Sequence, residues 1–369
     1  MRAIALTLLF GCLAGVLMIE AFLRYDDYSA LAVDYVYHEW DGRERRVMAT
    51  AEDLADPRKA VVVLGDSMVA GINCGYDQNL VGHFSRAMQS IAPGYKAINL
   101  GSANTSVFAY LDQLQGYEAG QGAPAGVIVM LYTNDADIIE PRMCPVLDVI
   151  ERSATVTPEE KAEIRDFCAD VMVGQSAYDG ETPWFAIGGP VDTWLHGVSY
   201  AYRFFRESFA VLAVSFGGGE PVGRLRYPGL WSDAGSLEFR LIAAGMDEIK
   251  AFADRHGIPL MVAFYPPIEF LSRDNPMYAA SEIAGRALAE QLGVPVLNGF
   301  EAYLGDPRAT TSMARSLTDH HPSCLGHQIL AEWLVENFEA AGGFEQRPAT
   351  TAPALTANDP ARLAQPAGD

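Results

Sequence analysis

The chain has 369 residues, half of them hydrophobic, and its 47 Asp and Glu outnumber its 26 Lys and Arg to give a formal net charge of -21. That length allows an α/β domain with a large insertion, and the apolar content allows a sizeable core. The negative charge excludes a nucleic-acid backbone as the partner, because such binding needs clustered Lys and Arg, and it disfavours an anionic membrane surface. We find no internal repeat, no P-loop and no dinucleotide-binding glycine fingerprint.

The first 24 residues carry the localisation signal. Between Arg2 and Arg24 the chain is almost continuously apolar, with few small or polar interruptions such as Glu20. This run reaches the roughly 20 residues that a helix needs to span a bilayer, and it exceeds the apolar part of a cleavable signal, roughly 7 to 15 residues. We therefore interpret residues 1–24 as a membrane anchor. A cleaved signal peptide followed by secretion is the alternative, and lipidation at Cys12 is a lesser one.

Cysteine usage agrees with export. Two disulfides are expected from an even number of cysteines in an exported chain, and the sequence cannot choose among the three possible pairings. The four cysteines outside the apolar segment are Cys74, Cys144, Cys168 and Cys324. We expect an inner-membrane anchor with the main domain outside the cytoplasm, in the periplasm.

Strands and helices alternate beyond a polar connector at residues 25–59. Short aliphatic runs predict buried strands at 60–64, 96–100, 126–132, 259–264 and 294–297. Longer amphipathic stretches predict helices at 80–90, 105–117, 237–256, 279–292 and 325–338. This alternation predicts one domain over residues 60–342, with a parallel five-stranded sheet between helical layers.

Residues 140–235 are too long a break in this alternation for a simple loop. Thr157, Pro158 and Glu160 form a helix-start pattern, and the helix that follows would carry Cys168. Further along, an aromatic-rich patch is compatible with a helical subdomain that packs its own core and with a substrate lid; its members are Trp184, Trp194, Tyr200, Tyr202, Phe204 and Phe205. Residues 343–369 are rich in Ala, Pro and Thr, and we expect a disordered tail there.

Candidate chemistry lies where the predicted strands end, the edge at which ligands bind in parallel α/β sheets. Ser67 follows the first strand in Gly65-Asp66-Ser67. A serine at this position can project its hydroxyl, and its N–H, toward a site. Taken alone, such a serine is more often a turn or capping residue.

The next two strand ends supply possible donors. Gly101 follows the second strand and lacks a side chain, so a ligand can approach its backbone N–H, and Asn134 follows the third strand with an amide. With the N–H of Ser67, these groups would form a three-donor cradle for an oxyanion. By itself Asn134 could equally be a turn former.

A serine nucleophile needs a base, and the strand-to-helix loop before residue 325 contains three histidines. Pro322 favours an extended conformation at His321, so Asp319 and His321, two residues apart, face the same way. Asp319 can then orient the imidazole of His321, as in a Ser-His-Asp arrangement. His320 would point away, and His327, on the next helix, would pack or cap.

The same stretch offers a metal-binding alternative through Asp319, His321, Cys324 and His327. Their spacing matches no recognised zinc pattern, and a disulfide would occupy Cys324. We therefore expect no metal.

These residues resemble the four sequence blocks of the SGNH (GDSL-like) hydrolases, in the same order, over a core from about residue 60 to 333 without the insertion. The matching residues are Gly65-Asp66-Ser67, Gly101, Asn134-Asp135, and Asp319 with His321. The resemblance implies a flavodoxin-like three-layer α/β/α fold and ester hydrolysis without a cofactor. It also implies Ser67 as nucleophile and Ser67, Gly101 and Asn134 as the oxyanion hole.

The chain departs from that family's pattern at two points. Tyr132 stands two residues before Asn134, where the family often has Gly, and only His320 separates Asp319 from His321, where the family commonly has two residues.

The leading hypothesis is a serine esterase or deacylase acting outside the cytoplasm on a small-molecule, glycan or lipid ester. An O-acyltransferase of the cell envelope would use the same triad, with a sugar hydroxyl in place of water. A catalytically silent binding or assembly protein could keep the same fold, because fold alone does not establish activity.

Overall fold

The computed structural model describes residues 11, 14–22, 37–40, 43–46, 49–71, 74–102, 105–136, 147–173, 199, 202, 227–315 and 321–344. Five parallel strands form its central sheet, in the order β4-β3-β5-β6-β7. Their bounds are β3 Lys59–Leu64, β4 Tyr95–Asn99, β5 Gly126–Leu131, β6 Leu260–Phe264 and β7 Val296–Asn298. The predicted parallel five-stranded sheet is confirmed.

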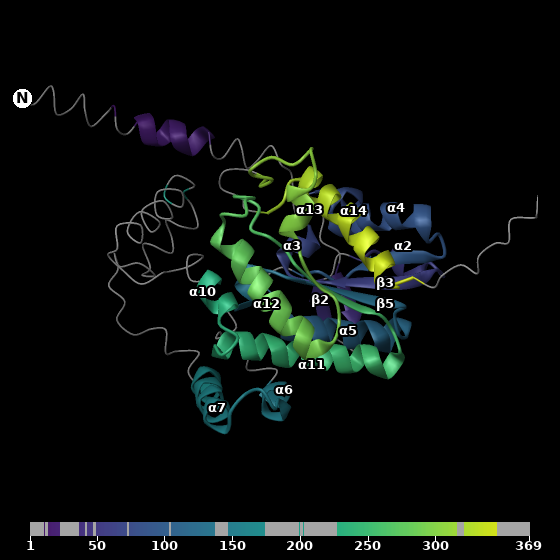
Figure 1. The fold of residues 1–369 in the computed structure, drawn as a ribbon, viewed down its shortest axis with the longest axis vertical. Coiled ribbons are helices and arrows are strands. Elements are labelled where there is room, and N and C mark those ends of the chain that lie inside the picture. The colour runs from purple at the N-terminus through teal and green to yellow at the C-terminus, as the bar shows by residue number, and fades with distance from the viewer. Residues whose placement is uncertain are drawn as a thin grey trace, which may run out of the picture.

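Helices cover both faces of this sheet (Figure 1). Helices α4 (Leu80–Ile91) and α14 (Cys324–Ala340) pack together on one face, and α5 (Val107–Gln121) and α11 (Leu237–His256) pack together on the other. Helix α12 (Pro276–Leu292) lies beside α11 and β7. The three-layer α/β/α architecture is therefore confirmed.

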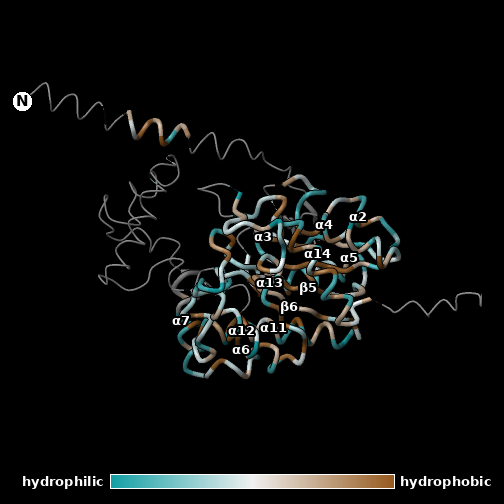
Figure 2. The backbone as a smooth tube through the Cα atoms, turned by 45° about the horizontal axis from the view of Figure 1, so that its top comes forward, coloured by the Kyte–Doolittle hydropathy of each residue, from teal (hydrophilic) through white to brown (hydrophobic). Residues whose placement is uncertain are grey.

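The strands are buried on both faces, which explains their unbroken aliphatic sequences. All residues of β4, β5 and β6 are buried, and in β3 only Lys59 is exposed. In Figure 2 the apolar colour concentrates at the centre of the domain, along the labelled strands β5 and β6. A strand with two covered faces has no polar alternation, so its register is set by its neighbours rather than by amphipathicity.

Helix boundaries follow local capping. Ser236 caps α11 by accepting a hydrogen bond from the N–H of Phe239 at 3.1 Å, and Gly257 ends the helix with a φ of 61°. Such a left-handed conformation is cheap only for glycine. Helix α12 begins earlier than predicted because Asn275 accepts from the N–H of Met277 and Pro276 occupies the first turn.

The helix start predicted at Thr157 in the insertion is confirmed. Helix α7 spans Pro158–Val173; Thr157 accepts from the N–H of Glu160 at 3.3 Å, while the Glu160 carboxylate accepts from the N–H of Thr157 at 3.0 Å. Two further helices of the insertion are described, α6 (Leu147–Arg152) and α10 (Tyr227–Ser232). The aromatic patch lies outside the described residues except for Tyr202, so the choice between subdomain and lid stays open.

Several short elements were not predicted. Residues 25–59 contain an antiparallel pair, β1 (Tyr37–Trp40) with β2 (Arg43–Arg46), and a helix, α2 (Ala51–Ala55), where the sequence suggested only a connector. The other short elements are α3 (Ser67–Ala70), η1 (Tyr76–Gln78), η2 (Thr133–Ala136) and α13 (Phe300–Leu304). The helices among them have three to five residues, too few to show a helical period, and β1 and β2 lack the aliphatic runs that predicted the sheet strands.

At the N-terminus, residues 14–22 are helical. None of the helices in the described ranges is both long enough and apolar enough to cross a bilayer. Residues 345–369 lie outside the described part, so the prediction of a disordered tail remains untested.

We expect the α4–α14 layer to limit the stability of the domain. Phe84 on α4 is 1 % exposed, and replacing a fully buried aromatic side chain by Ala leaves a cavity. Phe84→Ala should lower the free energy of unfolding by about 3–5 kcal/mol in urea titration. The control is Ile91→Ala on the same helix, where the side chain is 37 % exposed and a much smaller loss is expected. If Phe84→Ala lowered the free energy of unfolding as little as Ile91→Ala does, the layer would contribute little packing energy.

Candidate active site

Ser67 occupies the point at which the order of the strands reverses. The chain moves from β3 to β4 on one side and later to β5 on the other, so the carboxyl end of β3 opens between its two neighbours. There Gly65 turns the chain directly into α3, and an added Cβ would lie 2.3 Å from Cγ2 of Val69. Only glycine allows the helix to fold back this tightly on the strand.

Helix α3 presents the hydroxyl and the N–H of its first residue, Ser67. The side chain of Asp66 caps the helix by accepting a hydrogen bond from the N–H of Met68 at 2.9 Å. Among the described residues the Ser67 N–H has no hydrogen-bond partner, as expected for the first N–H of a helix. Ser67 is partly exposed, whereas its neighbours Asp66 and Met68 are buried.

The Ser67 hydroxyl contacts an imidazole from the far end of the chain. Ser67 Oγ and His321 Nε2 are 2.9 Å apart, across 254 residues of sequence. This is the distance of a hydrogen bond between a nucleophile and its base. The structure therefore brings together the serine and the histidine that the sequence selected.

The backbone of His321 is held in a small antiparallel arrangement. The Arg315 N–H donates to the His321 carbonyl at 2.8 Å, and the Ser323 N–H donates to the Met313 carbonyl at 2.9 Å. Between them, Ala314 and Pro322 form an antiparallel bridge. The bridge thus begins at Pro322, the chain bends at His321, and the His321 ring reaches Ser67.

Asp319 and His320 lie outside the described residues. The pairing of Asp319 with His321 therefore stays a prediction. His327, by contrast, has the packing role that was expected. It is fully buried in α14, its Nδ1 lies 3.3 Å from the hydroxyl of Tyr265, and burial lowers its pKa to about 3, so it is neutral at neutral pH.

The N–H of Gly101, predicted as an oxyanion donor, is hydrogen-bonded within the protein. Its N–H donates to Oδ1 of Asn99 at 2.9 Å, so in this structure it is not directed toward a ligand. An added Cβ would lie 2.4 Å from the backbone nitrogen of Ala70, which means that α3 packs directly on Gly101. Gly101 is thus required for the placement of the nucleophile helix.

The sequence did not identify Asn99 as a functional residue. Its side chain is fully buried and joins two elements of the site: Oδ1 accepts from Gly101, and Nδ2 donates to the carbonyl of Val69 in α3 at 3.2 Å. A polar residue at the end of a fully buried strand was the available signal, since a buried amide must find partners.

Asn134 lies on η2, directly after β5, and is partly exposed. Its amide lowers the pKa of the Asp66 carboxyl, although no hydrogen bond of ordinary geometry joins the two side chains. This places the amide beside the start of α3. The strand end that carries Asn134 is held by Trp231, whose indole N–H donates to the Thr133 carbonyl at 3.1 Å.

Two buried carboxyl groups underlie the site. Asp66 is 1 % exposed and Asp135 is fully buried; Asp135 accepts hydrogen bonds from the Tyr110 hydroxyl at 2.8 Å and from the Tyr132 N–H at 2.7 Å. Burial raises the pKa of Asp66 to about 6, while His321 opposes this rise. Burial, and then repulsion from Asp66, raise the pKa of Asp135 well above its usual value.

The two groups thus divide their roles by environment. The like charges repel, so Asp135 favours the protonated form, and Asp66 is the group that carries negative charge at neutral pH. Asp66 lies near enough to His321 for the two groups to interact electrostatically. Asp66 is therefore a second carboxyl group, besides the predicted Asp319, that can interact with His321. The sequence had suggested Asp66 only as part of the Gly65-Asp66-Ser67 motif.

The structure removes one of the four candidate metal ligands. Cys324 is bonded to Cys74 in a disulfide with a Cα–Cα distance of 5.6 Å. Within the described ranges, no three His, Cys, Asp or Glu side chains gather as a metal site. Cys168 is disulfide-bonded as well, to a partner outside the described residues.

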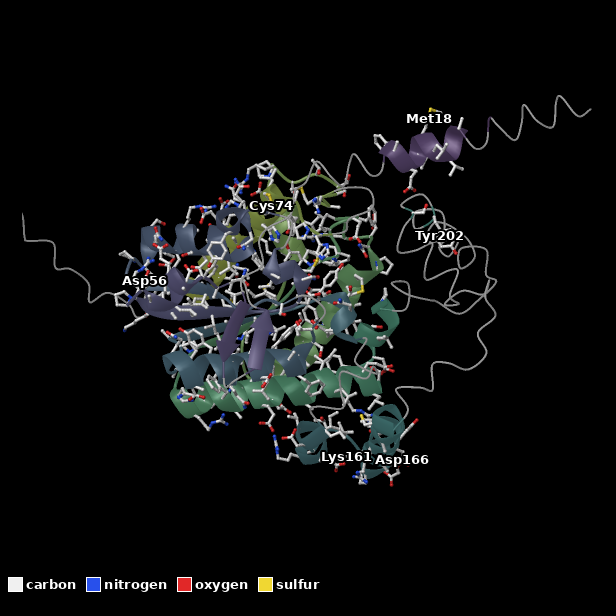
Figure 3. The ribbon with its side chains drawn as sticks, turned by 180° about the vertical axis from the view of Figure 1, so that it is seen from behind. Met18, Asp56, Cys74, Lys161, Asp166 and Tyr202 are labelled. Atoms are coloured by element: carbon white, nitrogen blue, oxygen red, sulfur yellow. A yellow bond between two sulfur atoms is a disulfide. The ribbon has the colours of Figure 1, made fainter. Side chains whose placement is uncertain are left out.

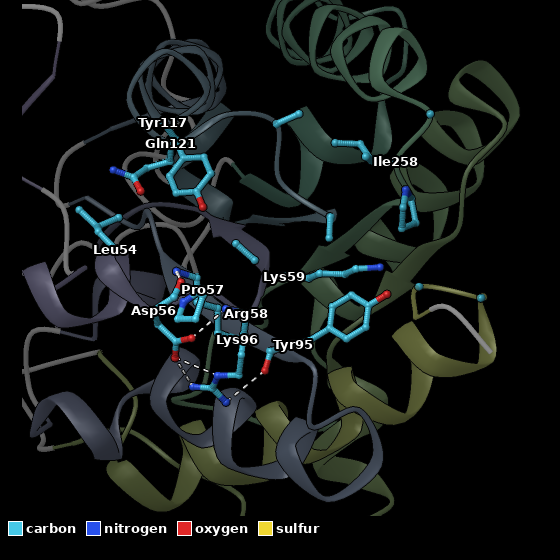
Figure 4. A pocket seen from close by; sticks show the side chains of 17 residues that line it. Leu54, Asp56, Pro57, Arg58, Lys59, Tyr95, Lys96, Tyr117, Gln121 and Ile258 are labelled. Atoms are coloured by element: carbon cyan, nitrogen blue, oxygen red, sulfur yellow. Dashed lines mark hydrogen bonds and ion pairs between the residues drawn. The ribbon is translucent and has the colours of Figure 1, made fainter. Parts of the chain in front are cut away.

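A cavity of about 660 Å³ lies at the other end of the sheet, where the strands begin (Figure 4). Its lining includes Lys59 and Tyr95, at the start of β3 and β4, and an ion pair in which Arg58 and Asp56 approach to 2.6 Å. Figure 3 labels Asp56 at this edge. Neither Ser67 nor His321 lines this cavity, so it is separate from the candidate active site.

No protein-family model and no curated protein matches the chain. Several solved structures resemble it. One is a member of the lipolytic protein G-D-S-L family from Veillonella parvula, with a TM-score of 0.36, 11 % identity and coverage of 76 % of this chain and 98 % of the other. A catalytic mutant of an acetylxylan esterase from Geobacillus stearothermophilus has a TM-score of 0.36, 10 % identity and coverage of 75 % and 93 %. The structure of TesA has a TM-score of 0.40, 12 % identity and coverage of 77 % and 99 %. Because these identities and TM-scores are low, they assign no activity to this chain.

The raised pKa of Asp66 predicts a pH-dependent stability. A buried carboxyl with a pKa of about 6 holds its proton in the folded chain but loses it near its ordinary value of 3.8 when unfolded. The folded state then binds more protons between these values, so its stability should fall as the pH rises from about 4 to 7. In Asp66→Asn the decrease in the free energy of unfolding between these pH values should be smaller by up to about 3 kcal/mol. Urea titrations at several pH values would measure it. An unchanged slope in the variant would show that Asp66 is ionised in the folded chain throughout this range.

Proposed function

We propose that this protein is a serine hydrolase that cleaves an ester, with Ser67 as nucleophile and His321 as general base. The observation that carries the proposal is the 2.9 Å contact between Ser67 Oγ and His321 Nε2 at the carboxyl end of the sheet. A serine hydroxyl is a weak nucleophile at its own pKa, and an adjacent imidazole is the common means of activating it. The resemblance in sequence to the SGNH hydrolases points the same way.

In the first half of the reaction, His321 Nε2 takes the proton of Ser67 as Oγ attacks the ester carbonyl carbon. The carbonyl oxygen becomes an oxyanion, His321 then passes its proton to the departing alcohol, and an acyl-enzyme remains. In the second half, water attacks the acyl group while His321 accepts its proton, and the acid leaves as Ser67 recovers its hydroxyl. Neither half requires a cofactor or a metal ion.

The oxyanion would be held by the unpaired N–H of Ser67 and by the amide of Asn134. Gly101 can add a third donor only when its N–H leaves Oδ1 of Asn99. During both halves His321 is transiently positive, and Asp319 together with the carboxylate of Asp66 would stabilise that charge. The latter effect is supported by the lowering of the Asp66 pKa by His321.

We further propose that the protein acts outside the cytoplasm, anchored by its first 24 residues. Two disulfide-bonded regions, at Cys74–Cys324 and at Cys168, support an oxidising compartment. In the helix at 14–22 the side chains of Val16, Leu17, Met18 and Phe22 are exposed, an apolar surface that a lipid environment would cover. The Glu20 carboxylate in this helix accepts a hydrogen bond from Ser199 at 2.9 Å. Esters of lipids and of envelope glycans are both compatible with this location.

Removal of the nucleophile gives the most direct test. The full-length protein in detergent should hydrolyse short-chain nitrophenyl esters, and Ser67→Ala should lower kcat by at least about 10³-fold, because no other group can form the acyl-enzyme. Ser90→Ala is the matched control, since this exposed serine on α4 hydrogen-bonds only within its own helix. Equal rates for wild type and Ser67→Ala would exclude Ser67 from the mechanism. Inactivity of the wild type toward all such esters would favour an acyltransferase or a silent protein.

The base can be tested against its neighbour in sequence. His321→Ala should lower kcat about as strongly as Ser67→Ala, because the two residues act as a unit, while His320→Ala should retain most activity. Asp319→Asn should lower kcat by a smaller factor, on the order of 10²-fold or more, by releasing the orientation of the imidazole. If His320→Ala were the inactive variant, the assignment of His321 as the base would be wrong.

A further inference from the structure

The Cys74–Cys324 disulfide connects the two segments that carry the catalytic pair. Cys74 lies seven residues after Ser67, and Cys324 lies three residues after His321, whereas the two cysteines are 250 residues apart in sequence. By the chain alone, nucleophile and base are joined through nearly the whole domain. Through the disulfide they are joined by two short segments. Cys74 is labelled in Figure 3.

On the nucleophile side, hydrogen bonds link the cysteine to the helix that carries Ser67. The N–H of Gly71 donates to the Ser67 carbonyl at 3.1 Å, and the N–H of Cys74 donates to the Gly71 carbonyl at 3.1 Å. Gly71 has a φ of 66°, and an added Cβ there would lie 2.3 Å from Cβ of Asn79, the cap of α4. A displacement of Cys74 would therefore be transmitted to α3.

On the base side, Cys324 is the first residue of α14. Ser323 caps this helix by accepting from the N–H of Gly326 at 3.2 Å, and its own N–H donates to the Met313 carbonyl at 2.9 Å. Two residues earlier, His321 is held through its carbonyl by Arg315. Cys324 is thus tied to the same short backbone ladder that orients the imidazole.

Helix α3 is four residues long, and so short a helix has little stability of its own because nucleation costs more than one turn returns. Its position therefore depends on contacts outside the helix, among them the strand ends at Gly65 and Gly101. The packing of α4 on α14 fixes the bodies of those two helices, but Ser67 and His321 lie before them in the chain. The 2.9 Å contact therefore depends also on the two short segments, each containing a turn, that the disulfide crosslinks.

We propose that the Cys74–Cys324 disulfide is a positioning device for the Ser67–His321 pair, so that full hydrolase activity requires this bond to be formed. The inference rests on the proposed function. Misplacement of catalytic groups by about 1 Å can cost on the order of 10²-fold in rate, so a modest relaxation of the two turns would suffice. The enzyme would then reach full activity only where disulfides form, after export.

The test compares three forms of the full-length protein in detergent: wild type, Cys74→Ser/Cys324→Ser, and Cys168→Ser as the control that removes the other disulfide. Two readouts are used, kcat and KM on a nitrophenyl ester, and the rate at which a fluorophosphonate labels Ser67. In labelling, Ser67 Oγ replaces fluoride on phosphorus and its proton passes to His321, so the rate reports activation of the nucleophile. The double variant should lose about 10-fold or more in kcat and in labelling rate, with a much smaller change in KM. Cys168→Ser should stay within about 2-fold of wild type in both.

Reversible reduction covers the case in which the double variant does not fold. A dithiol such as dithiothreitol, added to folded Cys168→Ser protein, transfers two electrons and two protons to Cys74–Cys324, giving two thiols and the cyclic disulfide of the reagent. Labelling should slow by the same factor while the near-ultraviolet circular dichroism persists, and oxidised glutathione should restore it.

Full labelling and kcat in the folded double variant, or in the reduced protein, would overturn the positioning role and leave the proposed function standing. A wild-type protein that neither hydrolyses esters nor reacts with the fluorophosphonate would overturn the proposed function, and the positioning role with it.

Discussion

Convergence of strand ends at one edge of the sheet is the constraint on which this structure depends. In a parallel sheet every strand delivers its following loop to the same edge, and the reversal of strand order at β3 leaves a gap between the loops on either side. Ser67, Asn99, Gly101 and Asn134 come from three adjacent strands and meet around this gap. His321 reaches the same edge from the last loop before α14, and its ring completes the contact with Ser67.

Close backbone packing beneath Ser67 makes this convergence possible. Gly65 and Gly101 both stand where a methyl group would collide with α3, so the nucleophile helix lies directly on the ends of two strands. Asn99 then joins Gly101 to α3 through a fully buried amide. These contacts seat α3 on the strand ends, and the Cys74–Cys324 disulfide then joins the segment after Ser67 to the segment after His321.

The two buried carboxyl groups of this region lower the stability of the fold. Burial raises the pKa of both, repulsion from Asp66 raises that of Asp135 further, and Asp66 is therefore the one that ionises first. A chain selected for stability alone would place apolar residues here. The pair instead places a carboxyl group near the imidazole of His321. Perturbed pKa values of this kind concentrate at functional sites.

The sequence by itself determined the sheet, the long helices, and the serine and histidine that meet at its edge, because these were selected from local patterns. Buried aliphatic runs, capping residues such as Thr157, and the proline after His321 each act within a few positions of the chain. The sequence could not determine that the Gly101 N–H would be taken by Asn99, that Asp66 and Asp135 would be coupled, or which cysteines would pair. Those facts depend on distances between residues far apart in the chain, and only the tertiary structure decides such distances. A one-turn helix like α3 is decided in the same way, since its few hydrogen bonds form only where the strand ends around it hold it in place.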